Sequence, residues 1–253
     1  MPADSGTASG LYATPPTDCV GTLGAGGRRR FGPDDCDMAL AVTAERYRGC
    51  GRLAHGYVRS KLRRDPVHRD VLYLAAEESF GDVVDIGCGR GQLAIALLQA
   101  GLAKSVLGVD CQAVHLAQAD RAAAGLAYRS RFVDLADGFD APEADTILAV
   151  DVLYQLDDCS QQRLLRNVAR AARCRVVLRL LDPGCGMRSA VTVGLERLWR
   201  GFSPHAGRCV NPWTVARIAG FLRSEKYDVT VTPCWRGTPF ANVLLIARRQ
   251  QSR

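Results

Sequence analysis

The sequence lacks several features that would assign it to common protein classes. No two of its ten cysteines have the Cys-x-x-Cys spacing of a zinc site, so no metal site is expected. No apolar run approaches the roughly 18 residues of a membrane span. The N-terminal segment has no apolar signal sequence, so we expect a cytoplasmic protein with reduced cysteines. Cys88, Cys111 and Cys174 adjoin expected strands and are predicted to be small buried fillers.

Lysine is also scarce, because only Lys61, Lys104 and Lys226 occur among 33 basic residues. The formal net charge is +7, which we attribute to a generally basic surface rather than to a nucleic-acid site. A length of 253 residues suits one sizeable domain. Residues 1–36 are rich in small and polar residues, which predicts a disordered tail before a domain over residues 37–253.

The rest of the chain is organised around the stretch Val83-Val84-Asp85-Ile86-Gly87-Cys88-Gly89-Arg90-Gly91. The apolar residues of a strand give way to three alternating glycines, and a helical pattern begins directly afterwards at Gln92. Glycines permit a sharp turn and the close approach of a ligand, and a helix start offers free N–H groups. This order predicts a nucleotide-binding corner.

The ligand of this corner is expected to carry positive charge. Gln92 stands where the dinucleotide fingerprint GxGxxG has its third glycine. Asp85 lies just before the first glycine, and its carboxylate would repel a pyrophosphate but attract a cation. S-adenosylmethionine has a sulfonium and an α-ammonium group, and it therefore suits the corner better than NAD.

The sequence VVDIGCGRG resembles the first motif of the class I S-adenosylmethionine-dependent methyltransferases, in particular the small-molecule type. The resemblance runs from about Val83 to Leu181 and implies S-adenosylmethionine as the cofactor. The expected fold is an α/β, doubly wound, mostly parallel seven-stranded sheet with a terminal antiparallel hairpin and an N-terminal helical extension over residues 37–80. Strand patterns over 105–110, 128–134, 145–150 and 175–181, and a hairpin over 227–247, agree with it.

Acids at strand ends are the main candidates for cofactor binding. Asp110 follows Gly91 by about 20 residues, where a carboxylate can accept hydrogen bonds from both ribose hydroxyls. Capping of the next helix is its alternative role. The resemblance implies that Asp134 accepts from the adenine amino group and that Asp85 and the glycine turn hold the methionyl end. The predicted cofactor-binding residues are Asp85, Gly87, Cys88, Gly89, Gly91, Asp110, Cys111, Val133, Asp134 and Asp151.

The residues that would contact a methyl acceptor are less well determined. The segment Asp151-Val152-Leu153-Tyr154-Gln155-Leu156 resembles the family's fourth motif and lacks the Pro-Pro-aromatic sequence of nucleobase amino methylation. Tyr154 and His205 are the catalytic candidates. His205, in a long insertion over residues 182–212, is a general-base candidate on position alone.

The N-terminal helices and a strand arginine supply further candidates. Tyr47, His55 and Tyr57 would line an acceptor pocket, or alternatively pack in the core or face solvent. Arg179 lies within an apolar strand, where an unpaired charge is costly. It therefore either binds a ligand carboxylate or pairs with a buried acid.

The C-terminal half, through Arg179-Leu180-Leu181-Asp182-Pro183 and Trp235-Arg236-Gly237-Thr238-Pro239-Phe240, is similar to methyltransferases of bacterial aryl-polyene pigment pathways. This likeness implies secondary metabolism and an aromatic or polyketide-like acceptor. We therefore predict direct methyl transfer to a small organic molecule. An RNA or protein methyltransferase, favoured by the basic N-terminal helices, and a non-catalytic partner with the cofactor fold are the alternatives.

Overall fold

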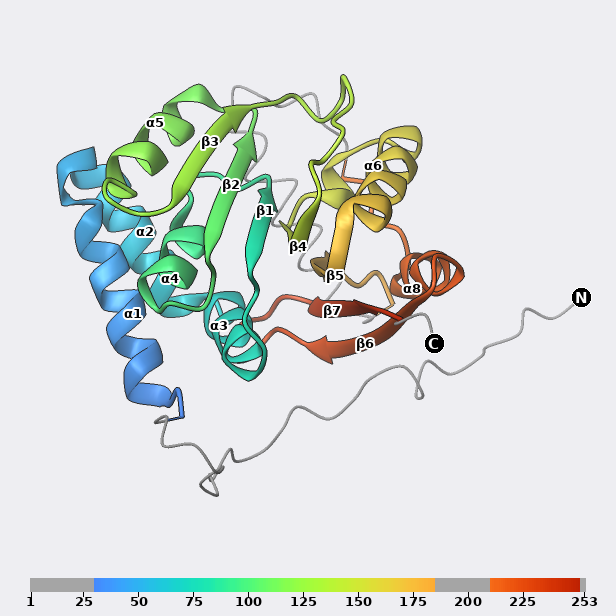
Figure 1. The fold of residues 1–253 in the computed structure, drawn as a ribbon, viewed down its shortest axis with the longest axis horizontal. Coiled ribbons are helices and arrows are strands. Elements are labelled where there is room, and N and C mark those ends of the chain that lie inside the picture. Colours follow the sequence, from blue (N-terminus) through green and yellow to red (C-terminus); the bar gives the residue numbers. More distant parts are fainter. Residues whose placement is uncertain (1–29, 185–209, 251–253) are drawn as a thin grey trace, which may run out of the picture.

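The computed structural model describes residues 30–184 and 210–250. Within them, a seven-stranded sheet has the order β3-β2-β1-β4-β5-β7-β6 (Figure 1). Strands β1 to β5 are parallel, and β7 runs antiparallel to both β5 and β6. The predicted doubly wound sheet with its terminal hairpin is confirmed. The strands are β1 (Asp82–Ile86), β2 (Ser105–Asp110), β3 (Tyr128–Phe132), β4 (Ala144–Val150), β5 (Ala172–Leu181), β6 (Tyr227–Pro233) and β7 (Asn242–Arg249).

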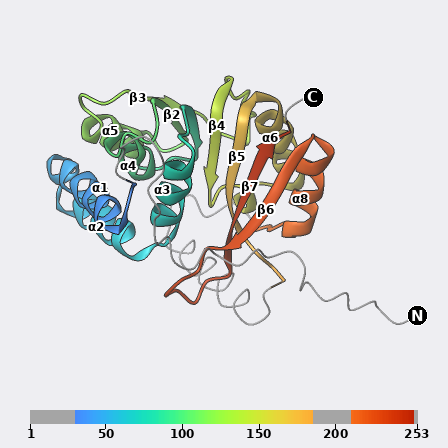
Figure 2. The same cartoon turned by 60° about the horizontal axis from the view of Figure 1, so that its bottom comes forward.

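Helices cover both faces of the sheet (Figure 2). One side carries α1 (Pro33–Arg46), η1 (Arg48–Cys50), α2 (Arg52–Arg64), α3 (Val67–Glu77), α4 (Gln92–Gln99) and α5 (Ala113–Ala122). The other side carries α6 (Asp158–Ala171) and α8 (Val215–Ser224), and the short helix η2 (Leu153–Gln155) follows β4. The sequence Gly49-Cys50-Gly51 is expected to divide the N-terminal helical segment, and the chain does break there between α1 and α2. However, α1 begins at Pro33, inside the segment predicted to be disordered. None of the described helices is long and apolar enough to cross a membrane.

Successive side chains of the central strands point to opposite faces of the sheet and pack into two hydrophobic cores, one on each face. In β1, Val84 and Ile86 join the core beneath α6 and α8, whereas Val83 joins the core beneath α1 to α4. In β5, Leu178 and Val177 divide in the same way. This two-sided burial explains why the central parallel strands are apolar runs rather than alternating sequences.

Several local expectations are wrong. From the sequence, Ser160 is expected to cap the helix that carries Leu164, Leu165 and Val168. Instead the Asp157 carboxylate caps α6, by accepting a bond of 2.8 Å from the Ser160 N–H. Both residue types are good N-caps, so sequence alone does not separate them. Likewise Asn211-Pro212 predicts the start of a helix that runs through Phe221, but α8 begins after Thr214. Cys174 is exposed and Cys111 only half-buried, so of the three cysteines only Cys88 is a buried filler.

Candidate functional site

The predicted acids gather at one edge of the sheet. Asp110 ends β2, Asp85 lies one residue before the end of β1, and Asp151 directly follows β4. Asp134 lies two residues beyond β3, which is shorter than predicted. These are the carboxyl ends of four adjacent parallel strands, the edge at which open α/β sheets bind ligands. An extended ligand along this edge would meet Asp134, Asp110, Asp85 and Asp151 in that order.

The glycine turn is fastened to the neighbouring strand and open at its centre. Gly87, Gly89 and Gly91 have φ values of 69°, 55° and 71°, a region that side chains disfavour. The Gly87 and Cys88 N–H groups donate to the Val109 carbonyl at 2.8 and 3.0 Å. A Cβ added to Gly89 would meet no atom within 4 Å, so a ligand can approach its backbone closely.

The other two glycines serve packing. A Cβ on Gly87 would lie 2.4 Å from Val152 Cγ2, so the segment after β4 packs directly on the turn. A Cβ on Gly91 would lie 3.1 Å from the Tyr128 hydroxyl. Tyr128 also lies 3.7 Å from Cys88 Sγ, and burial raises the pKa of that thiol. Cys88 is therefore an unreactive thiol beneath the turn.

The Asp110 carboxylate binds the glycine turn and retains lone pairs that can accept hydrogen bonds from a ligand. Its Oδ2 accepts from the Gly89 N–H at 2.9 Å, and its Oδ1 accepts from the Gln112 N–H at 2.8 Å, which is a helix-entry role. Each carboxylate oxygen has a second lone pair, so two ribose hydroxyls can still be accepted. Asp134 Oδ1 similarly accepts from the Ala136 N–H at 3.0 Å. The helix-entry role of Asp110 is therefore compatible with the predicted ribose contact.

Asp85 is the unusual member of the set. It is only 3% exposed, and within residues 30–184 and 210–250 no donor bonds to its carboxylate. Burial, and then the charge of Asp110, raise the pKa of Asp85 to about 7. A buried carboxylate without a partner is costly, and a cationic ligand group would relieve that cost.

The N-terminal helices fasten the glycine turn from outside. The Tyr47 hydroxyl donates to the Arg90 carbonyl, and Arg90 Nε donates to Gln118 Oε1 at 2.8 Å. The Arg90 guanidinium also lies 4.5 Å from the centre of the half-exposed Tyr57 ring. Tyr47 is fully buried and packs in the core, the second of the roles considered for it. Half-buried His55 has its Nε2 3.9 Å from Glu45 Oε1.

Beyond β4, the buried Arg179 side chain forms ion pairs with two carboxylates of the protein. Its Nη1 donates to Asp65 Oδ1 at 2.6 Å, and its Nε lies 3.2 Å from Asp151 Oδ1. Arg179 therefore pairs with acids of the protein, the second of the two predicted roles. No local pattern identified Asp65 as the partner of Arg179, because the pairing joins segments 114 residues apart. Tyr154 is buried in η2 and stays a prediction, and His205 lies outside the described residues.

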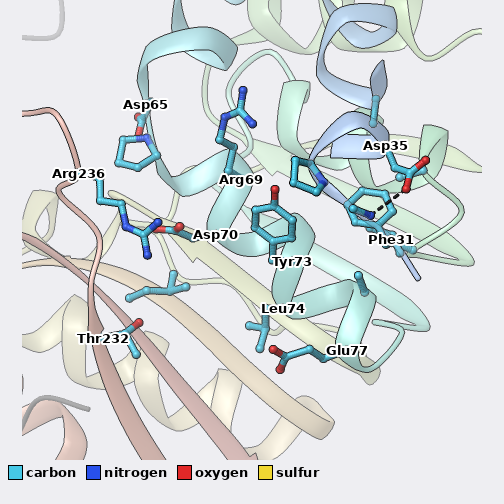
Figure 3. A pocket seen from close by; sticks show the side chains of 18 of the residues that line it. Phe31, Asp35, Asp65, Arg69, Asp70, Tyr73, Leu74, Glu77, Thr232 and Arg236 are labelled. Atoms are coloured by element: carbon cyan, nitrogen blue, oxygen red, sulfur yellow. Dashed lines mark hydrogen bonds between the residues drawn. The ribbon is translucent and has the colours of Figure 1, made fainter. Parts of the chain in front are cut away.

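A large groove among the described residues lies elsewhere. It measures about 1810 Å³, runs between α3 and the β6–β7 hairpin, and is lined by none of the predicted cofactor residues. Figure 3 shows Arg236 and Asp70 side by side in it. Only its end near Asp65 approaches the Arg179 ion pair. The candidate site is therefore the strand edge and not this groove.

Comparison with known proteins agrees with this assignment. Residues 83–174 match the family described as methyltransferase domain. Magnesium protoporphyrin IX methyltransferase from Synechocystis PCC 6803 with bound SAH is 20% identical, with 85% of this chain and 97% of that chain covered at a TM-score of 0.57. The pyocyanin biosynthetic protein PhzM is 20% identical, with 83% and 62% covered at 0.56. The small RNA methyltransferase HEN1 is 19% identical, with 74% and 25% covered at 0.56.

These structural similarities establish the fold, and the domain match covers the glycine turn and the four acids. Residues 83–174 are thus a methyltransferase domain, within a chain that has the fold of the similar methyltransferase structures. The domain match agrees with the predicted methyltransferase activity and with S-adenosylmethionine as the predicted cofactor.

Proposed function

We propose that the enzyme transfers a methyl group from S-adenosylmethionine to a small organic acceptor by direct in-line displacement. The observation that carries the proposal is the Asp85 carboxylate, buried beside an open glycine turn with no donor bonded to it among the described residues. A sulfonium and an ammonium group are the charges that would stabilise its ionised form. A pyrophosphate would be repelled.

The residues present fit this cofactor along its whole length. Asp85 and the open Gly89 backbone would hold the methionyl end, and Asp110 the ribose hydroxyls. Asp134, with Val133 and Cys111 beside it, would hold the adenine. Asp151 lies next to the turn, because Val152 packs on Gly87. The order of these side chains along the sheet edge follows the order of the cofactor's own parts.

The cofactor, when bound, supplies a methyl group on a sulfonium that is already a good leaving group. The protein's task is therefore mainly alignment and exclusion of water. Tyr47, Gln118 and Tyr57 fix Arg90 and with it the glycine turn. A general base is needed only where the acceptor must lose a proton, and Tyr154 and His205 stay candidates for that role.

For the acceptor we favour a small aromatic or polyketide-like molecule of secondary metabolism. The segment after β4 has the small-molecule form of the motif, and two of the similar structures are named for a porphyrin and for pyocyanin biosynthesis. The similarity to HEN1 and the basic helix α2 favour RNA as the second candidate. A protein acceptor and a non-catalytic role have no such observation in their favour.

The first experiment is calorimetry of the whole protein with S-adenosylmethionine, S-adenosylhomocysteine and NAD. We expect binding of the first two and none of NAD. A radiolabelled-methyl screen would then compare a small-metabolite extract with RNA and protein fractions. Label in small molecules supports the proposal, whereas label in RNA, with binding that falls steeply as salt rises, would establish the second candidate instead. A folded protein that binds neither nucleoside would refute the enzyme assignment.

A further inference from the structure

Arg179 connects the N-terminal helices with the segment after β4. It is buried on β5, opposite Val150, and the two acids it contacts come from opposite parts of the chain. Asp65 forms the elbow between α2 and α3, and Asp151 follows β4. One guanidinium thus fastens the elbow to the strand edge where the candidate site lies. A planar guanidinium can serve two carboxylates at once, which a lysine ammonium does less well.

The elbow is held firmly. Asp65 Oδ1 accepts from Arg179 and also from the Val67 N–H at 3.2 Å, while Lys61 Nζ lies 3.0 Å from Asp65 Oδ2. Buried His68 contributes a ring nitrogen 3.3 Å from the Asp65 carbonyl. The nearby cations keep the pKa of Asp65 well below its usual range. An ionised elbow in contact with two cations anchors the end of α2.

Asp151 has the backbone signature of a functional position. Its φ is 60°, although it carries a side chain, and such strain persists only where the surroundings enforce it. Its N–H donates to the Arg179 carbonyl at 3.3 Å, and its own carbonyl accepts from Gln155 Nε2. Its Oδ1 is near Arg179 Nε but is not aligned for a hydrogen bond. That oxygen is held in place with its hydrogen-bonding capacity unused.

We propose that Arg179 is a positioning residue that presents the Asp151 carboxylate to the reacting end of the cofactor and docks α2 over that end. The inference rests on the proposed function. It explains why an arginine occupies an apolar strand and why Asp151 tolerates a strained backbone. It also predicts a specific property, because S-adenosylmethionine carries a sulfonium charge and S-adenosylhomocysteine does not. A carboxylate held near that charge favours the former over the latter.

The chain supplies a matched control on the same strand. Arg175 is equally buried and also pairs with an acid beside α3, since its Nη2 lies 2.6 Å from Glu78 Oε1. It lies four residues earlier in β5, about 13 Å farther from the carboxyl edge. Arg175→Lys should therefore destabilise the fold much as Arg179→Lys does without touching the site.

The experiment compares Arg179→Lys with Arg175→Lys in the full chain. Calorimetry gives the dissociation constants of both nucleosides, and hydrogen exchange by mass spectrometry follows the amides of α2. For Arg179→Lys we expect about tenfold weaker binding of S-adenosylmethionine, less than about threefold weaker binding of S-adenosylhomocysteine, and faster exchange in α2. Arg175→Lys should leave the ratio of the two constants and α2 exchange unchanged. Equal behaviour of the two variants would overturn the proposal.

Two further variants keep the test decisive. Asp151→Asn should likewise weaken S-adenosylmethionine binding more than S-adenosylhomocysteine binding. Adding Arg179→Lys to it should widen that difference no further, because both substitutions act through one carboxylate. Should Arg179→Lys fail to fold, Asp65→Asn replaces it, with Glu78→Gln as its control and the same two readouts. Wild-type protein that binds neither nucleoside would refute the proposed function. Exchange in α2 would then decide the docking role alone, and unchanged exchange in Asp65→Asn would refute that too.

Discussion

Replacement of Asp110 by alanine should weaken cofactor binding strongly and the fold only moderately. In our assignment the carboxylate accepts from both ribose hydroxyls, and the variant leaves buried hydroxyls without acceptors. Each such loss costs about 1–3 kcal/mol, so the dissociation constant should rise roughly 5- to 150-fold. The Gly89 and Gln112 N–H groups lose their acceptor as well, which should lower the free energy of unfolding by about 1–2 kcal/mol.

The measurement is calorimetric titration with S-adenosylhomocysteine, paired with chemical denaturation. Asp120→Ala is the control, since it removes a surface carboxylate of α5 that accepts from Ser130 Oγ at 2.8 Å and lies outside the predicted set. Asp110→Asn should fall between wild type and Asp110→Ala, because one acceptor oxygen remains. A folded Asp110→Ala variant with the wild-type dissociation constant would contradict the ribose assignment.

Three further predictions concern the corner itself. The pKa of Asp85 near 7 exceeds its unfolded value, so the free protein should lose stability as pH rises from about 4 to about 7. Cofactor binding at pH 6.5 should release a proton, detected by calorimetry in buffers of different ionisation enthalpy, and Asp85→Asn should abolish both effects. Gly89→Ala and Gly101→Ala should each cost about 1–2 kcal/mol of stability, since both glycines have positive φ and open space at Cβ, but only the former should impair binding. Tyr47→Phe, which frees the Arg90 carbonyl, should weaken S-adenosylhomocysteine binding about threefold. Tyr227→Phe, which loses a buried hydroxyl bonded to backbone carbonyls, should cost similar stability without that effect, and equal dissociation constants would argue against a role of Tyr47 in holding the turn.

Much of the fold could be predicted because its signals are local. Apolar runs at 83–86 and 145–150 marked central strands, and Gly87, Gly89 and Gly91 marked the turn between a strand and a helix. The C-terminal hairpin and the break in the helical segment near residue 50 could likewise be predicted from local sequence patterns. Where two good capping residues stood close together, as at Asp157 and Ser160, the pattern could not choose between them.

The features of the site that the sequence did not predict depend on contacts between distant segments. For Tyr47 the sequence left a pocket and the core as alternatives, because it does not reveal that Arg90 supplies a carbonyl to the Tyr47 hydroxyl. The partner of Arg179 could be specified only as an acid, since sequence spacing gives no hint that Asp65 reaches β5. The burial of Asp85 could be predicted from its place in a central strand. The sequence could not show that no donor among the described residues bonds to the Asp85 carboxylate.

The Asp65–Arg179 pair has a consequence for where this enzyme can be cut. The contact closes a loop of the chain that contains every residue assigned to the cofactor, from Asp85 to Asp151. The segment matched by the domain family, 83–174, lies wholly inside that loop and includes neither end of it. A fragment excised at those limits would lose Tyr47 and the elbow together with the arginine. We expect it to be an incomplete binding unit, and the minimal functional piece must extend outward to both partners.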